Sequence, residues 1–173
     1  GFIGSNLVKW FCENGSFEVT VIEPETASVM RLDGLQVEIV RVSLANVEVV
    51  EQIIANKRID TVVHLVSTLI PGSGYEDFKR ELTDMVFPSI RIMEYCARFD
   101  IKFVYFSSGG TVYGNRTTMQ PFVETDDMAP ISYYGWSKQM MENSILFKNR
   151  TEKLRYLIVR PSNPYGHGQN LYG

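Results

Sequence analysis

The feature that most constrains the fold of this sequence is the alternation of short, apolar, β-branched runs with stretches of helical periodicity. Runs of the first kind cover residues 19–23, 37–40, 61–66, 102–106 and 156–160. Continuous apolar strands that alternate with helices are typical of a parallel sheet covered on both faces. The sequence therefore predicts an α/β fold with a doubly wound parallel sheet, in which ligands bind just beyond the carboxyl ends of the strands.

Helices are expected between these runs. The apolar periodicity that predicts them involves Ile3, Leu7 and Phe11, then Val47, Val50 and Ile54, and two longer stretches over residues 82–99 and 134–148. Gly15 is expected to stop the first helix, and residues 71–74 read as a loop. No internal repeat and no second domain are evident, so residues 1–173 are interpreted as one domain.

Composition excludes several classes of protein. The chain has 173 residues, of which 45% are hydrophobic and 21% charged, as expected of a packed domain. The net charge is −3 and there is no run of basic residues, so the sequence does not indicate a nucleic-acid-binding protein. No apolar run reaches the roughly 18 residues that cross a bilayer. Cys12 and Cys96 form no motif, which favours two free thiols in a reducing cytoplasm.

Because the chain opens at Gly1 inside a glycine motif and stops at Gly173, we expect a fragment of a longer protein.

A glycine pair opens the chain and predicts a phosphate site. Gly1-Phe2-Ile3-Gly4 precedes the first expected helix, whose N-terminus favours negative charge. By itself the pair is equally typical of a plain turn. However, Glu23 ends the next strand 19 residues after Gly4, near the spacing at which a Rossmann-type fold places an acid on the adenosine ribose. The alternative for Glu23 is a solvated loop carboxylate. Together the two features predict NAD as cofactor, preferred over NADP.

A second motif predicts acid–base chemistry. Tyr134 and Lys138 are four residues apart and share one face of a helix. A lysine ammonium in that position, aided by an oxidised nicotinamide, is expected to lower the phenol's pKa so that the tyrosine can exchange protons. Tyr75 and Lys79 fit the same spacing but follow no strand-end serine, so they are interpreted as surface residues.

These motifs and three others resemble the extended short-chain dehydrogenase/reductases, specifically the NAD-dependent epimerase/dehydratase family to which UDP-glucose 4-epimerase belongs. The matching segments, in family order, are residues 1–4, 63–65, 107–114, 134–138 and 160–166. The resemblance implies a Rossmann-type domain that lacks the first strand and the C-terminal substrate region. It also implies a homodimer formed through the helices near residues 82–99 and 134–148.

The resemblance further implies which residues bind. Cofactor-binding residues would be Gly1, Phe2, Ile3, Gly4, Glu23, Ser43, Leu44, Leu65, Val66, Ser67, Tyr134, Lys138, Pro161 and Ser162. Asn163 would reach the diphosphate of a nucleotide sugar, and Thr111 would contact the sugar. Ser43 stands where the family usually has Asp, which removes a charge from the adenine contact.

Two departures from the family pattern affect the chemistry. The family's catalytic Ser or Thr aligns with Gly109, which has no hydroxyl, so Ser108 and Thr111 are the candidate replacements. We expect Thr111 to matter more, because it follows the glycines toward the substrate. Met85 replaces an Asn that is common in the long helix. His64 is interpreted as a strand-end core residue and His167 as loop surface, and two isolated histidines predict no metal site.

The resulting interpretation is a cytoplasmic, NAD-dependent nucleotide-sugar epimerase with Tyr134, Lys138, Thr111 and Ser108 as catalytic residues. Related dehydratases place Asp or Glu where this sequence has Gly110 and Thr111, which favours epimerisation over elimination of water. A dehydratase, a decarboxylase and a reductase remain alternatives within the family. A non-catalytic module that binds NAD or a nucleotide sugar is the alternative outside it.

Overall fold

A computed structural model describes residues 1–15, 17–116, 120–166 and 168–169, so the interpretation of His167 lies outside the described residues. Each of the five expected runs contains a strand: β1 (Thr20–Glu23), β2 (Glu38–Arg41), β3 (Thr61–His64), β4 (Lys102–Phe106) and β5 (Tyr156–Val159). The run 61–66 is shorter than predicted, because β3 ends at His64 and leaves Leu65 and Val66 in the segment that follows. This placement puts the expected cofactor residues beyond the strand rather than within it.

The strands form two parallel sheets. One has the order β1–β2, with Glu23 opposite Arg41, and the other has the order β3–β4–β5. Within the described ranges, no strand pairs with the second edge of β1 or with the free edge of β3. The α/β prediction with parallel strands is confirmed.

The helices follow the predicted positions with two differences. They are α1 (Phe2–Glu13), the 3-10 turn η1 (Met30–Leu32), α2 (Val47–Asn56), α3 (Tyr75–Glu81), the π-helical turn η2 (Leu82–Val86), α4 (Phe87–Arg98) and α5 (Tyr133–Glu152). The helix expected over 82–99 begins earlier, since α3, η2 and α4 follow one another without a break. The helix expected over 134–148 is one turn longer, because Lys153 ends it only after Glu152, in the left-handed conformation.

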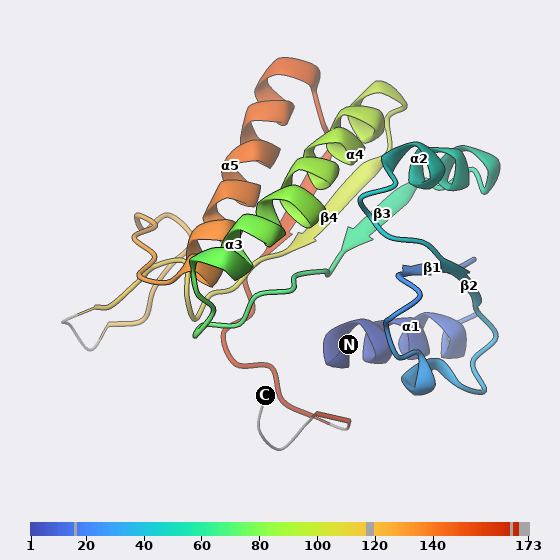
Figure 1. Cartoon of the computed structure of the whole chain (residues 1–173), viewed down its shortest axis with the longest axis horizontal. Helices are drawn as coiled ribbons and strands as arrows, with labels where there is room; N and C mark the ends of the chain where they lie inside the picture. Colours follow the sequence, from blue (N-terminus) through green and yellow to red (C-terminus); the bar gives the residue numbers. More distant parts are fainter. Residues whose placement is uncertain (16, 117–119, 167, 170–173) are drawn as a thin grey trace.

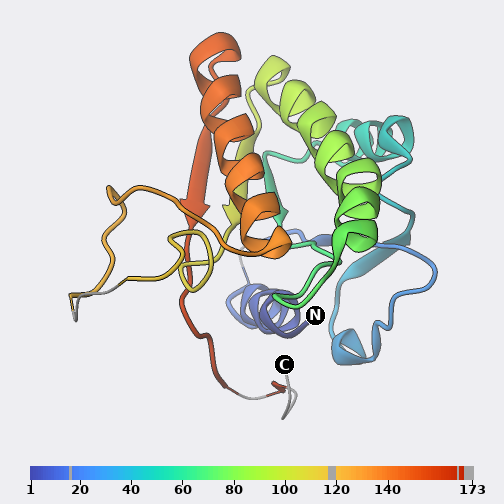
Figure 2. The same ribbon diagram turned by 60° about the vertical axis from the view of Figure 1, so that its left-hand side comes forward.

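The helices lie on both sides of the strands (Figures 1 and 2). Helices α2, α4 and α5 cover one face, while α1 lies on the other side. The core between α4, α5 and β4 contains the most deeply buried side chains, among them Met93, Phe103 and Ile145, each 0% exposed. This packed face carries the N-terminal end of α5, where the predicted Tyr134 and Lys138 lie.

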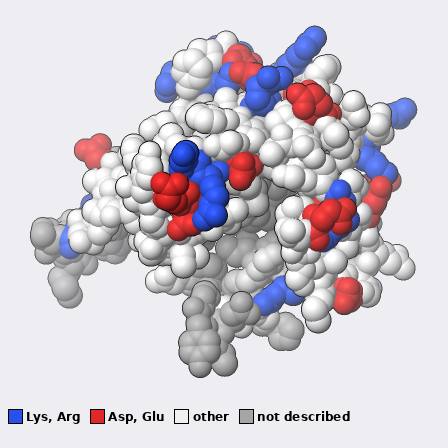
Figure 3. All heavy atoms as spheres, viewed as in Figure 1, with Lys and Arg blue, Asp and Glu red and all other residues white. Residues whose placement is uncertain are grey.

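The surface gives no indication of a single-sign binding patch on the side seen in Figure 3, where acidic and basic side chains alternate. None of the helices in the described part of the chain is both long and apolar enough to cross a membrane. In the same part, no three side chains that favour metals converge.

Candidate active site

The predicted pair Tyr134 and Lys138 lies in the first turns of α5, and local sequence explains why the helix starts there. The Ser132 side chain accepts a hydrogen bond from the Gly135 N–H at 3.1 Å, which caps the helix. Gly135 also lets the helix approach the neighbouring loop, because a Cβ at this position would lie 2.6 Å from the Thr111 carbonyl oxygen. The helix start is thereby pressed against the segment that follows β4.

Lys138 is a buried cation. Its side chain is 4% exposed, and its Nζ donates to the carbonyl oxygen of Phe106 at 3.0 Å. The same Nζ lies 5.6 Å from the centroid of the Tyr134 ring and 5.1 Å from that of Tyr105. Burial lowers the pKa of Lys138 from 10.5 to about 8, although the charges of Glu81 and Glu142 oppose that shift. The ammonium is therefore close to its titration at near-neutral pH.

Tyr134 does not have the lowered pKa that the sequence predicted. Burial raises the pKa of its phenol above 10.0, a hydrogen bond with the Ser108 hydroxyl opposes this, and the charge of Glu81 adds to it. The prediction of a lowered pKa is therefore wrong for the chain by itself. The physical reason is that Lys138 donates to a backbone carbonyl rather than to the phenol oxygen, while burial disfavours the phenolate.

The segment after β4 brings both candidate hydroxyls to this site. Ser108 is buried beside the Tyr134 phenol and lowers its pKa, whereas the Thr111 Oγ1 is buried without a hydrogen-bond partner among the described residues. Gly109 lies against the next strand, since a Cβ there would come within 2.8 Å of the Arg160 carbonyl oxygen. A serine or threonine at position 109 would thus have to displace backbone, which gives a physical reason for glycine at this position.

The expected phosphate loop lies at the N-terminal end of α1. Gly1 is the N-cap of α1, no side chain caps the helix, and its first turn contains no acidic residue. A Cβ on Gly1 would meet no described atom within 4 Å. Leu65 lies beside this loop, with its Cδ1 3.4 Å from a Cβ placed on Gly4. The backbone of Phe2 and Ile3 can therefore donate to an anion at this end.

The residues expected around the adenosine occupy the ends of β1 and β2. No hydrogen bond or ion pair engages the Glu23 carboxylate within the described residues, which leaves it available for ribose hydroxyls. Arg41 lies opposite Glu23 but donates to the Glu25 and Ala27 carbonyls instead. Ser43 accepts from the Ala45 N–H at 3.3 Å and so supports the turn before α2. Leu44 packs against the core.

The segment after β5 runs beside the glycines, as the predicted roles of Pro161, Ser162 and Asn163 require. The Pro161 carbonyl accepts from the Gly109 N–H at 2.8 Å. A Cβ on Gly110 would lie 3.5 Å from the Ser162 carbonyl oxygen and 4.0 Å from the Asn163 Oδ1. Ser162 and Asn163 are exposed, so their side chains can reach a ligand.

Sequence reasoning missed two buried groups. The first is Glu81 at the end of α3, 3% exposed, whose carboxylate binds Ser67 and Thr68 behind β3. The only signal in the sequence was a carboxylate on a helix face otherwise occupied by Phe78 and Met85. Its position was decided by the packing of α3 against the site.

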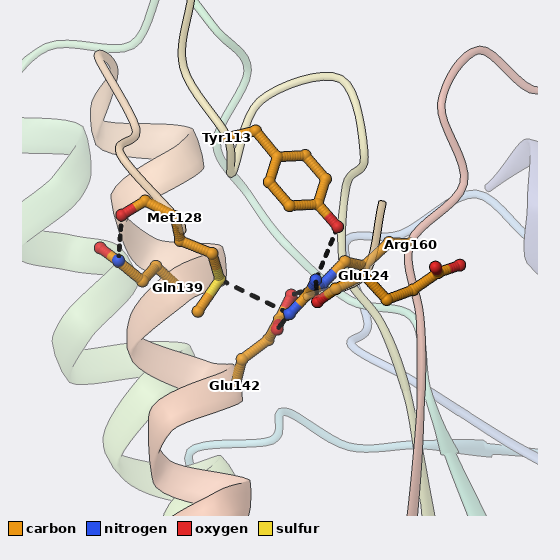
Figure 4. A network of polar contacts seen from close by, with 6 residues as sticks. All are labelled: Tyr113, Glu124, Met128, Gln139, Glu142 and Arg160. Carbon is orange, nitrogen blue, oxygen red and sulfur yellow. Dashed lines mark hydrogen bonds and ion pairs between the residues drawn. The ribbon is translucent and has the colours of Figure 1, made fainter. Parts of the chain in front are cut away.

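The second missed group is the network around Arg160, at the end of β5 (Figure 4). Its guanidinium forms a 2.6 Å ion pair with Glu142, a side chain that is 0% exposed, and donates to the Tyr113 hydroxyl at 2.6 Å. It also donates to the Glu124 carbonyl at 3.0 Å. These contacts fasten the loop after β4 to both α5 and β5.

The second Tyr-x-x-x-Lys motif lies on the surface, as predicted. Tyr75 is 61% exposed at the start of α3, and its ring contacts that of Tyr133 at a centroid distance of 6.3 Å. His64 lies in the core at the end of β3, where its Nε2 is 2.7 Å from the Ser89 hydroxyl. Burial lowers the pKa of His64 to about 3, which keeps the ring neutral.

Comparison with known proteins identifies the class that this fold and site define. The model of the NAD dependent epimerase/dehydratase family matches residues 1–172, and the chain belongs to that family. The cofactor of the family is NAD, and the N-terminus of α1 without a side-chain cap, the free Glu23 carboxylate and the buried Lys138 fit it.

Particular relatives sharpen the comparison. A putative UDP-glucose 4-epimerase of Methanocaldococcus jannaschii is 31% identical over all of this chain and 56% of its own length. A dTDP-4-dehydro-6-deoxyglucose reductase of Escherichia coli is also 31% identical, over 76% of this chain and 41% of its own length. The crystal structure of UDP-glucose 4-epimerase from Thermotoga maritima with UDP-glucose superposes on all of this chain and 56% of its own, with a TM-score of 0.89 and 30% identity. The chain thus spans about half the length of the relatives it matches, and the Rossmann-type prediction is confirmed.

Proposed function

We propose that the protein containing this chain is an NAD-dependent nucleotide-sugar epimerase of the UDP-hexose 4-epimerase type. The observation that carries the proposal is the environment of the Tyr134 hydroxyl. It lies beside Ser108 and a buried lysine, and Gly110 and Thr111 stand where related dehydratases have acidic side chains. Such a site offers one proton shuttle but no carboxylate in the segment to drive elimination.

The chain's own residues divide the chemistry between them. NAD, when bound, accepts a hydride from the sugar and returns it. Tyr134 takes the proton of the sugar hydroxyl and later gives it back, as a positioned general base and acid. The Lys138 ammonium stabilises the phenolate, and the hydroxyls of Ser108 and Thr111 bridge the sugar oxygen and Tyr134. Epimerisation also requires the oxidised sugar to turn over within the site.

The proposed contacts with NAD and the substrate lie along the carboxyl ends of the strands. Phe2 and Ile3, between Gly1 and Gly4, offer backbone N–H groups to the pyrophosphate, and Glu23 accepts from the adenosine ribose. The remaining proposed cofactor contacts are Ser43, Leu44, Leu65, Val66, Ser67, Lys138, Pro161 and Ser162. Asn163 and Thr111 are the proposed substrate contacts, with a nucleotide sugar as substrate in the cytoplasm.

A reductase is the second candidate, favoured by the similar dTDP-4-dehydro-6-deoxyglucose reductase. Product analysis separates it, and a dehydratase, from the epimerase. The complete protein is incubated with UDP-glucose, UDP-N-acetylglucosamine and dTDP-glucose, and, together with NADH, with the keto-sugar dTDP-4-dehydro-6-deoxyglucose. A C4-inverted sugar with no net cofactor consumption supports the epimerase. A 4-keto-6-deoxy product, or stoichiometric oxidation of NADH, contradicts it, and bound NAD without any turnover indicates a non-catalytic module.

The contributions of the Ser108 and Thr111 hydroxyls to turnover can be compared in the same assay. The sequence favoured Thr111, whereas Ser108 is the hydroxyl that lowers the pKa of the Tyr134 phenol in this chain. Thr111→Val leaves the shape of the side chain and removes a buried hydroxyl that has no partner within the chain's described residues. A larger loss from Thr111→Val than from Ser108→Ala would mean that the Thr111 hydroxyl finds its partner in the substrate.

A homodimer is proposed from α4 and α5, which lie side by side on one face of the molecule (Figure 1). Large apolar side chains remain exposed on them, including Phe87 at 58% and Phe147 at 52%. Light scattering of the complete protein tests this, and Phe147→Glu is expected to shift the mass toward the monomer. A monomeric parent would contradict the proposal.

A further inference from the structure

One buried charge remains outside the chemistry described so far. The Glu81 carboxylate accepts from the Ser67 hydroxyl at 2.9 Å, from the Thr68 N–H at 2.9 Å and from the Thr68 hydroxyl at 2.6 Å. The Ser67 oxygen in turn accepts from the Leu69 N–H at 3.3 Å. Three neutral donors of one short segment are therefore organised around a single carboxylate, at the position where β3 gives way to the expected cofactor contacts.

Charge balance sets Glu81 apart from the other buried carboxylate. Glu142 has its own cation in Arg160, and the buried Lys148 has carboxylates at 2.5 and 2.8 Å. In the portion of the chain that the structure describes, Glu81 and Lys138 are the two buried full charges without an ion pair. An isolated buried charge is costly, and opposite charges in one poorly solvated region offset each other even beyond contact distance.

We propose that Glu81 is a positioning residue of the Tyr134–Lys138 site: it holds residues 67–69 behind β3 and supplies the counter-charge of Lys138. The proposal rests on the proposed function in one respect, the role given there to Lys138 beside Tyr134. The π-helical turn η2 begins directly after Glu81, which is consistent with a local distortion that serves a site.

The electrostatics of the neighbouring groups support this role. The charge of Glu81 raises the pKa of Lys138, against the larger effect of burial, which lowers it. The same charge raises the pKa of Tyr134, in addition to the larger effect of burial. The other groups that face the pair are Tyr105 on β4, His64 at the end of β3, and Glu142 on α5. His64 is neutral, Tyr105 has a pKa raised by burial, and Glu142 is matched by Arg160. Glu81 is thus the one unmatched acidic charge among these facing groups.

The test compares Glu81→Gln, which keeps the shape and removes the charge, with Ser67→Ala, which removes one donor and keeps the charge. The readout is the pH titration of Lys138, followed by NMR at its Cε in the complete protein and assigned by its absence in Lys138→Met. We expect the titration to move to lower pH in Glu81→Gln and to stay at the parent value in Ser67→Ala. An unshifted titration in Glu81→Gln, or equal shifts in both variants, would overturn the counter-charge role.

A second measurement covers the case in which Glu81→Gln does not fold. Removing both charges in Glu81→Gln/Lys138→Met is then expected to restore a cooperative melt, because neither charge is left uncompensated. If the double variant is as unstable as the sum of the single variants, the proposal is wrong. Neither readout requires turnover. Inactivity of the parent on every nucleotide sugar would therefore contradict the proposed function while leaving this inference separately testable.

Discussion

The two sheets of the molecule differ sharply in how they are held. In the β3–β4–β5 sheet, Phe103 and Tyr105 are 0% and 1% exposed beneath α4 and α5. In the β1–β2 sheet no strand residue is fully buried, and α1 buries only Ser5. The proposed acid–base residues stand on the first sheet, whereas Glu23 and the phosphate loop belong to the second. The proposed acid–base residues therefore stand on the more deeply buried sheet of this chain, and the proposed adenosine contact on the less buried one.

The largest expected effect concerns the 173-residue chain by itself. Amide hydrogen exchange should show strong protection in β4 and α5 and almost none in β1 and β2. The free edges of β1 and β3 leave backbone groups unpaired, each at a cost of about 1–3 kcal/mol against a net stability of about 5–15 kcal/mol. NAD binding should accordingly be poor. A single sharp melt with uniform protection and tight NAD binding would remove the distinction between the sheets.

The next effect tests chemistry on the β3–β4–β5 sheet. Tyr134→Phe in the complete protein is expected to lower turnover by about 10²–10⁴-fold, the usual contribution of general acid–base catalysis, while NAD affinity changes little. Tyr75→Phe is the matched control. It should have little effect on turnover, because the Tyr75 ring is exposed on the surface. Greater damage from Tyr75→Phe would mean that the wrong motif was assigned.

The next prediction tests how much the buried ion pair between Glu142 and Arg160 stabilises the β3–β4–β5 sheet. Glu142→Gln leaves the Arg160 guanidinium without its carboxylate and is expected to reduce the free energy of unfolding by about 3–5 kcal/mol. The control is Asp100→Asn at the exposed pair with Arg155, where about 0–1 kcal/mol is expected. Denaturant melts measure both. Similar losses at the two sites would show that the Arg160 network does not stabilise the β3–β4–β5 sheet.

The proposed role of Glu23, at the end of β1, is tested through the preference for NAD over NADP. Glu23 is expected to repel a 2′-phosphate, so the complete protein should bind NAD at least about tenfold better than NADP, or about 1.4 kcal/mol. Glu23→Gln should reduce this ratio, whereas Glu25→Gln, two residues further along the same loop, should not. Equal affinities of the parent for both dinucleotides would mean that Glu23 points away from the ribose.

A smaller, graded effect is expected from pH. The folded-state pKa of Lys138, about 8, lies below its ordinary value of 10.5. Burial of the ammonium therefore costs stability below about pH 8, and this cost is relieved as the pH rises toward 10.5. Turnover should fall over the same range, because the ammonium is lost. Melting temperature and activity recorded together as a function of pH check this. The rise in stability should disappear in Lys138→Met.

The sequence by itself determined what depends on local periodicity. The five strands lie where continuous apolar runs were found, and Tyr134 and Lys138 share a helix face because their spacing of four residues matches the helical repeat. The absence of acidic residues from the first turn of α1 can likewise be read directly from the sequence. Such features need no knowledge of which elements pack together.

Only the tertiary structure decided what depends on residues distant in sequence. Glu81 reaches donors 13 and 14 residues away, and Arg160 joins Glu142 and Tyr113 across 18 and 47 residues. The pKa of Tyr134 rose rather than fell because packing buries the phenol and directs Lys138 to the Phe106 carbonyl. Burial and counter-charge arise from the way α3 and α5 dock on one sheet, and no pattern of neighbouring residues specifies that arrangement.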